Sequence, residues 1–542
     1  MDVGSERAEH EGRLARAWTT FRVLQGAGLL QPGFLVSSIA GLRRYGRTAG
    51  GSLLAATRRR PNAPALIDDR GTLTFAELWD RSQRLAQGLR ASGIKEGSGV
   101  GILCRNHRGF LESITALGLL GADALYLNTG FAAPQLRDVL DREGASAIIY
   151  DEEFEAVVAP AIANRPGYLA WHDGPPTRTT LEQLIAAHAA GRIEKPARMG
   201  RTTILTSGTT GTPKGAQRTG QSSGGVDTVI GVLELMPLRR DSTRFVVAPA
   251  FHAWGLAQLI AAVLFHCTVV LRRRFDPEDT LRAIAATRTD EMVVIPTMLQ
   301  RILELPPEVI RRHDTRSLRL VAASGSALPG ELARRWMDTF GDNLYNLYGS
   351  TEVAQASIAR PQDLRAAPGT AGIPPRGTLV RILDADGKPL PAGQSGRIFV
   401  RNSLKFSGYT GGGSKAVIGD LMATGDVGRF DSEGRLFIEG RDDDMIISGG
   451  ENVFPQEIED LLSDHPAIAD VAVIGVEDSE FGQRLKAFVV RRPGAQLDAE
   501  GVRSHVRSHL ARHKVPRDVE FLDEIPRTQT GKVLKRVLRE RT

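Results

Sequence analysis

The chain has 542 residues, of which 42% are hydrophobic and 6% aromatic, and its net charge is +6. This length and composition predict a globular protein of more than one domain, and the two cysteines, Cys104 and Cys267, are too few for a disulfide framework or a zinc or iron–sulfur site. Ten arginines and four acids fall in residues 1–60, so the rest of the chain is neutral and we expect no nucleic-acid-binding surface.

Residues 1–60 are predicted to form an Arg-rich N-terminal arm. Pro32 and several glycines interrupt its apolar residues, so a helical arm packed on the protein body is favoured over one lying on an anionic membrane surface. Four acids precede the first apolar run, which is unlike a secretory signal. We therefore expect a cytoplasmic protein, with peripheral contact at the inner face of the membrane through this arm as the second interpretation.

Residues 61–439 are predicted to form a large α/β domain. Thr74 is a suitable N-cap for a helix that carries apolar residues at helical spacing from Phe75 onward. Short β-rich runs then alternate with helical segments, which predicts parallel sheets covered by helices. The uncharged run 253–271 is interrupted by polar residues and predicts a core helix followed by a strand instead of a membrane span. From about residue 377, short strands and tight turns predict a small antiparallel β unit.

Residues 440–542 are predicted to form a separate, mobile α+β domain. Helical patterns at 455–462 and 502–510 alternate with strand patterns at 471–476, 486–490 and 519–522. The polar run that begins at Arg441 suits a hinge between the two domains.

The most informative segment is Thr206–Gly215, which reads Thr-Ser-Gly-Thr-Thr-Gly-Thr-Pro-Lys-Gly. Glycines let backbone N–H groups crowd an anion, hydroxyls donate to phosphate oxygens, and a lysine adds a mobile cation. It is not a Walker A motif, because Pro213 precedes Lys214 and Gly215 follows it. We predict that this loop binds a polyphosphate through Lys214 and through Thr206, Ser207, Gly208, Thr209, Thr210 and Gly211.

Further segments offer the remaining contacts of an ATP site. Tyr348 has an aromatic face for a base, Thr351 a hydroxyl for a phosphate, and Glu352 a carboxylate for Mg²⁺. Asp426 suits a ribose diol, with Arg441 as a further donor. Lys532 lies in a second lysine-bearing glycine turn near the chain end. Taken singly, each of these residues also has an ordinary structural explanation: the 348–352 segment as a helix cap, Asp426 as a turn residue, Arg441 as a surface arginine and Lys532 as part of a basic tail.

In their order along the chain, these segments resemble the motifs of the adenylate-forming, or AMP-binding, superfamily. The resemblance spans roughly residues 60–540 and is greatest to the acyl-CoA synthetase branch, in particular to fatty acyl-CoA ligases of the actinobacterial type. The matching motifs are 206–215, Phe251-His-Ala-Trp-Gly, Ser324-Gly-Ser-Ala-Leu, Tyr348-Gly-Ser-Thr-Glu, Thr424-Gly-Asp, the segment 440–453 and Pro526-Arg-Thr-Gln-Thr-Gly-Lys.

The resemblance implies a two-step reaction that uses ATP, Mg²⁺ and coenzyme A. A carboxylic acid, expected to be a fatty acid, is first joined to AMP with release of pyrophosphate, and the thiol of coenzyme A then takes the acyl group. Lys532, Lys214, Thr351 and Glu352 are the implied catalytic residues, with Glu352 binding the metal. Ser324, Gly325, Ser326 and Tyr348 would border adenine.

The resemblance also implies roles in acid binding and domain motion. His252 and Trp254 match the segment that borders the acyl site. Asp443 matches the hinge residue about which the small domain rotates, and Gly449 and Gly450 would then line the path of coenzyme A.

Three other interpretations stay open from the sequence. The enzyme could load acyl groups onto a carrier protein, or the chain could be a binding protein that has kept the fold. Gly220-Gln-Ser-Ser-Gly matches a serine-hydrolase elbow around Ser222, but the polar residues before it are unlike the buried strand that such an elbow needs. The sequence predicts neither the chain length or aromaticity of the acid nor the oligomeric state.

Overall fold

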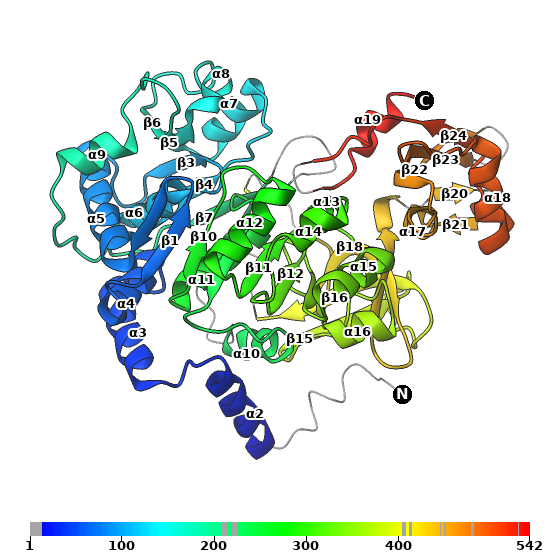
Figure 1. The fold of residues 1–542 in the computed structure, drawn as a ribbon, viewed down its shortest axis with the longest axis horizontal. Helices are drawn as coiled ribbons and strands as arrows, with labels where there is room; N and C mark the ends of the chain where they lie inside the picture. The colour runs from blue at the N-terminus through cyan, green and yellow to red at the C-terminus, as the bar shows by residue number, and fades with distance from the viewer. Residues whose placement is uncertain are drawn as a thin grey trace.

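The computed structural model describes residues 13–206, 214–218, 225–403, 408–410, 415–444, 446–448, 451–478, 482–528 and 531–542. Figure 1 shows a large body that runs from the N-terminal helices into two adjoining sheets, with a smaller C-terminal unit, coloured orange to red, on one side. The predicted fold class is confirmed, with helix-covered sheets, an antiparallel β unit and a small α+β C-terminal part.

The first sheet has six strands in the order β6-β5-β3-β4-β7-β8. All neighbouring pairs are parallel except β7 and β8. Its strands are β3 (Gly99–Leu103), β4 (Asp123–Tyr126), β5 (Ala145–Asp151), β6 (Gly167–Trp171), β7 (Thr202–Thr206) and β8 (Lys214–Arg218).

The second sheet has eight strands in the order β14-β13-β12-β11-β9-β10-β1-β2. Its six central strands are parallel, and the strand at each edge is antiparallel. These strands are β1 (Pro64–Asp68), β2 (Gly71–Thr74), β9 (Thr243–Val246), β10 (Thr268–Val270), β11 (Glu291–Val294), β12 (Leu320–Ala323), β13 (Leu344–Tyr348) and β14 (Ser357–Ala359).

Helices cover both sheets, and the largest core cluster contains residues of both. The helices α4 (Ala49–Arg59), α5 (Phe75–Ala91), α6 (Arg108–Leu120) and α11 (Ala253–Leu264) all contribute to it. Thr74 caps α5 as predicted, because its hydroxyl accepts from Glu77 N–H while the Glu77 carboxylate accepts from Thr74 N–H. The other helices of the large part are α7 (Ala133–Arg142), α8 (Glu155–Val158), α9 (Leu181–Ala187), α10 (Gly225–Leu235), α12 (Pro277–Thr287), α13 (Pro296–Leu303), α14 (Pro307–Arg311), α15 (Gly330–Phe340) and α16 (Pro361–Ala366).

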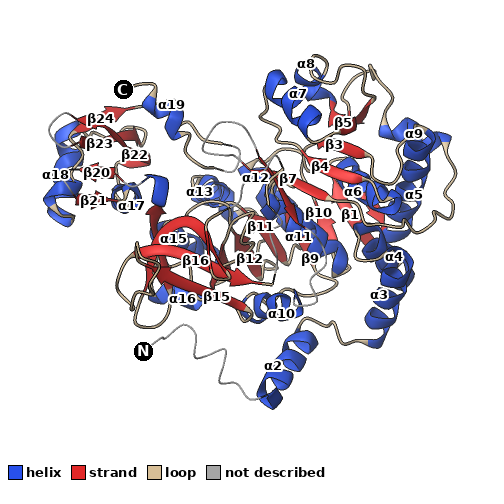
Figure 2. Ribbon diagram, turned by 180° about the vertical axis from the view of Figure 1, so that it is seen from behind, coloured by secondary structure: helices blue, strands red, loops and turns tan. Residues whose placement is uncertain are grey.

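The antiparallel unit predicted from residue 377 is a five-stranded sheet of β15 (Thr378–Leu383), β16 (Gly396–Asn402), β17 (Val417–Ile418), β18 (Leu421–Phe430) and β19 (Leu436–Arg441). In Figure 2 it lies between the eight-stranded sheet and the small C-terminal unit.

The C-terminal unit has hydrophobic clusters of its own. Its elements are β20 (Ile446–Ser448), β21 (Glu451–Val453), α17 (Pro455–Ser463), β22 (Ile468–Asp478), β23 (Gly482–Arg491), α18 (Ala499–His509), β24 (Asp518–Phe521) and α19 (Lys535–Arg539). Across the boundary, Gln300 Nε2 of α13 donates to the Ala469 carbonyl at 3.2 Å. Thr297, also on α13, lies against the turn at Gly531.

The N-terminal segment is helical, as predicted, and comprises α2 (Arg13–Gly26), α3 (Pro32–Tyr45) and α4. In α4, Leu53 and Ala56 are buried in the main core. None of the helices described for this chain is long and apolar enough to cross a bilayer. The uncharged run 253–271 forms α11 and β10, which confirms the prediction of a core helix followed by a strand.

Candidate active site

Three of the predicted site residues lie at or just beyond the carboxyl ends of parallel strands of the eight-stranded sheet. Ser324 directly follows β12, Tyr348 ends β13, and Glu352 lies four residues further on. This edge is where ligands bind in open α/β sheets. The five-stranded sheet adds Asp426 from β18, and the small domain adds Lys532.

Tyr348, Asp426 and Arg441 form a connected group. The Tyr348 hydroxyl donates to Asp426 Oδ2 at 2.5 Å, and Arg441 Nη1 lies 3.4 Å from Asp426 Oδ1. The register of β18 and β19 places Asp426 directly opposite Arg441. Burial raises the pKa of Asp426, against the opposing effects of the Tyr348 hydrogen bond and the Arg441 charge. The residues predicted to contact adenine and ribose therefore touch one another.

Glu352 is buried, with 8% of its surface exposed. Burial opposes its ionisation, but hydrogen bonds from Tyr409 and Ser350 and the charge of Lys415 hold the pKa of this carboxyl below its usual value. Tyr409 donates to Glu352 Oε1 at 2.6 Å. A buried carboxylate whose surroundings favour its ionised form is a ligand type that Mg²⁺ accepts, so the residue fits its predicted metal-binding role.

Lys532 reaches this group from the small domain. Its backbone N–H donates to Thr528 Oγ1 at 3.1 Å, and Thr528 N–H donates to the Lys532 carbonyl at 2.7 Å. Arg527 Nη1 donates to the Gly531 carbonyl at 2.7 Å, which closes the turn. Gly531 has φ +80°, and a Cβ there would lie 2.7 Å from Thr297 Cγ2, so glycine lets the turn sit against the large domain.

The Lys532 ammonium lies among the predicted ATP contacts. Much of its side-chain surface is accessible, yet the protein packed around the ammonium desolvates it and lowers its pKa, helped by the charges of Arg441 and Lys415 and opposed by Asp426 and Glu352. Neither Lys532 nor Lys415 has an ion-pair partner within 4.0 Å among the described residues. The site thus holds positive charge that the described chain does not neutralise.

Lys415 and Tyr409 are site residues that the sequence analysis missed. Lys415 Nζ donates to the Thr424 carbonyl at 3.4 Å, directly before the Gly425–Asp426 pair. Lys415 is one of only ten lysines in a chain that carries most of its positive charge on arginine, and this rarity is a sequence signal that could have singled it out. No recognised motif contains it, however, and only the tertiary fold brings it to Glu352.

The predicted polyphosphate loop is described only at its two ends. Residues 207–213, and with them Ser207, Gly208, Thr209, Thr210 and Gly211, lie outside the described residues. The backbones of Thr206 and Lys214 pair across β7 and β8, while their side chains are also outside the description. Gly215 N–H donates to Thr410 Oγ1 at 3.1 Å, and Thr410 N–H donates to the Gly215 carbonyl at 2.8 Å. Because Tyr409 contacts Glu352, this pairing holds the exit of the loop near the carboxylate.

His252 carries an unpartnered polar atom in the site. It precedes α11, and its Nε2 is buried without a hydrogen-bond partner among the described residues. Burial lowers the pKa of His252 to about 4, with a smaller contribution from the charge of Lys532, so the ring is neutral near pH 7. Trp254 is held differently, because its Nε1 donates to the Val294 carbonyl at 3.0 Å. Its indole packs against two core clusters.

The remaining predicted residues are placed in part. Ser324 is buried, Gly325 has φ +100°, and Ser326 and Thr351 are half-buried. The hinge candidate Asp443 belongs to a 3₁₀ turn, Asp442–Asp444, with its side chain outside the described residues. Gly449, Gly450 and Ser222 also lie outside them.

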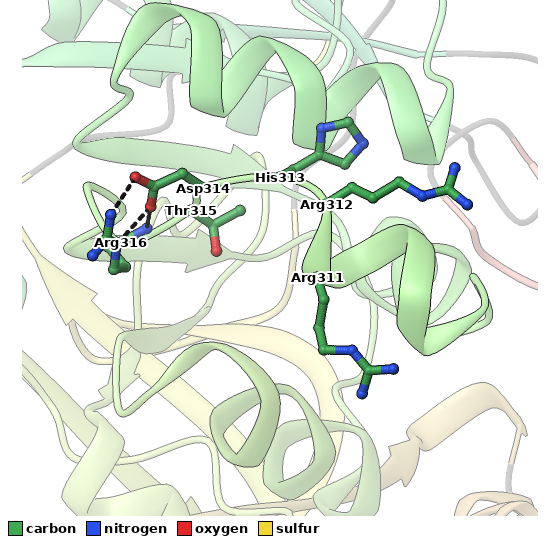
Figure 3. A pocket seen from close by; sticks show the side chains of 6 residues that line it. All are labelled: Arg311, Arg312, His313, Asp314, Thr315 and Arg316. Atoms are coloured by element: carbon green, nitrogen blue, oxygen red, sulfur yellow. Dashed lines mark hydrogen bonds and ion pairs between the residues drawn. The ribbon is translucent and has the colours of Figure 1, made fainter.

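Two other features are separate from this site. Residues Arg311–Arg316 line a hollow of about 360 Å³, and Figure 3 shows Arg316 paired with Asp314 there. This segment leads into the amino end of β12, on the opposite edge of the sheet from Ser324.

The other feature is a buried group of Cys104, His107 and Asp151, whose potential ligand atoms lie within 4.8 Å of one another. Both ring nitrogens of His107 already have partners within the protein. Nδ1 accepts a hydrogen bond from Gly109 N–H at 3.1 Å, and Nε2 lies 2.8 Å from Asp151 Oδ1. The geometry suits a structural hydrogen-bond network better than a metal site.

Comparison with known proteins supports the family that these motifs suggested. The AMP-binding enzyme family matches residues 53–410, and the AMP-binding enzyme C-terminal domain matches residues 457–532. The chain belongs to the AMP-binding enzyme family.

Its relatives within the family carry several activities in their names. A feruloyl-CoA synthase of Amycolatopsis sp. is 36% identical over 89% of this chain and 97% of its own, and an indoleacetate–CoA ligase of Aromatoleum aromaticum is 34% identical over 89% and 95%. A fatty acid–[acyl-carrier-protein] ligase of Streptomyces coeruleorubidus is 28% identical over 89% and 94%.

A solved structure of an o-succinylbenzoate CoA synthetase from Bacillus subtilis, in complex with its acyl-adenylate intermediate, is 28% identical with a TM-score of 0.78. It covers 90% of this chain and 97% of its own.

Proposed function

We propose that this AMP-binding enzyme is an acid–thiol ligase that converts a carboxylic acid, ATP and coenzyme A into acyl-CoA, AMP and pyrophosphate. The observation that carries the proposal is that Lys532, from the small domain, lies within electrostatic range of Glu352 and Asp426, from the large domain. Cations without ion-pair partners fit a site where an anionic acid and a polyphosphate must be brought together against their repulsion.

The described residues suit the first step. A carboxylate oxygen attacks the α-phosphorus of ATP, the bond from that phosphorus to the bridging oxygen breaks, and pyrophosphate leaves. Lys532 is placed to hold the acid and the developing phosphate charge, with Lys415 beside it. Tyr348, Asp426 and Arg441 would hold the nucleoside. Mg²⁺ held by Glu352 would supply charge neutralisation on ATP.

In the second step the sulfur of coenzyme A attacks the carbonyl carbon and AMP leaves with the bridging oxygen. We propose that residues 440–542 turn about Asp443 between the steps, so that Lys532 leaves and the Gly449–Gly450 segment enters. The small domain's separate core and its sparse contacts with α13 support such a motion. The boundaries 1–60, 61–439 and 440–542 and the cytoplasmic location stay predictions.

The acid is the least defined part of the proposal. A fatty acid is the prediction from the motifs, whereas the names of a feruloyl-CoA synthase and an indoleacetate–CoA ligase favour an aryl acid. His252 would border either acyl group through its neutral ring, because a charged ring would be costly beside Lys532.

The deciding experiment is a screen of aliphatic and aryl carboxylic acids for AMP release with ATP, Mg²⁺ and coenzyme A. We expect at least one acid to give AMP and acyl-CoA in equal amounts. AMP release without any acid, or none with any acid in the panel while ATP is bound, would contradict the proposal.

A second candidate is a ligase that loads an acyl carrier protein, and the name of the Streptomyces coeruleorubidus relative favours it. The dependence of product release on the thiol separates the two functions. If AMP turnover is stimulated by a phosphopantetheinylated carrier protein but not by coenzyme A, the carrier-protein ligase is the correct assignment.

A further inference from the structure

The N-terminal helices present an apolar surface that the proposed reaction does not use. Among the described residues, twelve large hydrophobic side chains are exposed, and six of them lie on α2 and α3. They are Trp18, Phe21, Leu35, Val36, Ile39 and Leu42. We call these six residues the arm surface. Exposed apolar side chains that are gathered in one place, instead of scattered singly over the surface, indicate an interaction site.

The inner faces of α2 and α3 already contact the rest of the protein. Arg376 donates to Thr20 Oγ1 at 2.9 Å and thereby holds α2. In α3, Phe34 is buried and its ring lies 4.6 Å from that of His266. The helix also packs closely on α4, since a Cβ at Gly41 would lie 2.1 Å from the Gly51 carbonyl oxygen. The outward apolar side chains are therefore additional to those that attach the helices.

The outward residues follow helical spacing. Leu35, Ile39 and Leu42 repeat at four and three positions along α3, so they share one face. On α2 the rings of Trp18 and Phe21 stack with their centroids 5.7 Å apart. Trp18 is 60% exposed and Val36 is 69% exposed, so neither finds cover in the described fold.

The charge on the arm helices themselves has a single sign. Residues 13–60 contain nine arginines and no aspartate or glutamate, although four acids precede them in residues 1–12. Arg22, Arg43 and Arg47 are exposed and make no ion pair with the described residues. The family match begins only at residue 53, so α2 and α3 lie outside the part that defines the family.

We propose that the arm surface docks on an anionic lipid bilayer, with its apolar side chains in the interface and its arginines among the headgroups. Aromatic and aliphatic side chains beside unpaired arginines are the combination that such an interface accommodates. A second copy of this chain fits less well, because a symmetric pairing would bring arginine against arginine. Nucleic acid fits the charge but not the exposed Trp18, Phe21 and aliphatic residues of α3. In Figure 1, α3 lies on the side of the molecule away from the small domain and α2 lies at the bottom of the view, so neither helix borders that domain.

The test is flotation of the full-length protein with vesicles. One vesicle type is phosphatidylcholine alone, and the other contains phosphatidylglycerol at about 30 mol%, since anionic lipid supplies the attraction for arginine. We expect binding to the anionic vesicles to exceed binding to the neutral vesicles by about tenfold or more, and to fall with added salt.

Two variants separate the contributions of apolar and charged residues. In the apolar variant, four residues are changed to Gln: Trp18, Phe21, Ile39 and Leu42. We expect it to lower vesicle binding by about tenfold or more. The charge variant combines Arg22→Gln, Arg43→Gln and Arg47→Gln, and we expect it to lower binding to anionic vesicles only. The matched control is Val417→Gln, which alters a side chain that is 52% exposed outside the arm. All variants should keep the melting temperature and the ATP-binding affinity of the parent protein.

Three results would overturn the proposal. The first is equal recovery of parent and arm variants with anionic vesicles. The second is a concentration-dependent dimer that the arm variants abolish, measured by light scattering, which would assign the surface to a second copy. The third is tighter binding to duplex DNA than to anionic vesicles at equal salt. None of these readouts depends on acid activation, so they test the arm separately from the proposed ligase activity.

Discussion

The two domains hold their parts of the site in different ways. In the large domain, the carboxylates of Glu352 and Asp426 are fixed by hydrogen bonds from Tyr409 and Tyr348. In the small domain, the hydrogen bonds that the described residues make to hold Lys532 lie within its own turn, and the turn meets the large domain through packing on Thr297. Two of the residues proposed to hold the nucleoside, Tyr348 and Asp426, thus lie in the large domain and bond to each other, whereas the charge at the reacting carboxylate depends on how the small domain is placed.

The largest expected effect comes from removing the small domain's cation. Lys532→Ala should lower the rate of acid-dependent pyrophosphate exchange by about 10² to 10³-fold, because a group that stabilises developing charge is lost. ATP affinity should change little, since Tyr348, Asp426 and Arg441 are untouched. The control is Lys388→Ala, which alters an exposed lysine of the large domain. A fall in ATP affinity as large as the fall in exchange rate would contradict the division of roles.

The contact between the domains can be altered without changing a charge. Gly531→Ala places a methyl group 2.7 Å from Thr297 Cγ2 and 2.9 Å from its Oγ1. The turn must then move, and we expect exchange to fall by about ten- to a hundredfold, because small displacements of a catalytic group have effects of this size.

Thr297→Ala removes both close atoms and should restore part of the activity of Gly531→Ala, with the positive φ still strained. Absence of any restoration in the double variant would show that the contact with Thr297 does not position Lys532.

Substitution of Lys415 tests whether the reaction needs this cation of the large domain in addition to Lys532. Lys415→Met should lower the kcat/KM for ATP by about tenfold, which corresponds to losing one hydrogen bond to a charged group. The fold should be kept, since among the described residues the Lys415 ammonium makes a single hydrogen bond, to the Thr424 carbonyl. Steady-state kinetics at varied ATP would check this, and an unchanged kcat/KM would remove Lys415 from the site.

The smallest expected effect is a shift in pH dependence. Desolvation, together with Arg441 and Lys415, lowers the pKa of Lys532 from its ordinary value of 10.5. The protonated amine is the active form, so the exchange rate should fall as pH rises through this lowered pKa, at a lower pH than for an ordinary lysine. Lys532→Arg keeps its charge to higher pH and should lose this alkaline limb. Identical profiles for the two proteins would assign the limb to another group.

Local patterns predicted the parts of the fold that depend on neighbouring residues. The Thr74–Glu77 cap, the helix from Ala253 and the strands on either side of residue 387 all follow from short-range spacing, and the structure has each of them. The long strand β18 was missed, because glycine, threonine and aspartate in its middle do not alternate in polarity.

The sequence predicted those site residues that stand in a recognisable motif. It did not predict those that only the tertiary fold brings to the site. Glu352, Asp426 and Lys532 stand in motifs with recognisable chemistry. Lys415 and Tyr409 stand in a segment without one, and they meet Glu352 only through the folding of the chain between β16 and β18. The buried Nε2 of His252, which has no hydrogen-bond partner in the described part of the chain, is likewise a product of the fold that spacing along the chain does not predict.

The central claim is that the acid is activated at the α-phosphorus of ATP. It is tested most directly with a substrate acid labelled with ¹⁸O in its carboxylate, followed by mass spectrometry of the AMP. The account predicts one ¹⁸O atom in the phosphate of each AMP released, because the bridging oxygen leaves with the nucleotide. Unlabelled AMP, or label in inorganic phosphate instead, would contradict it.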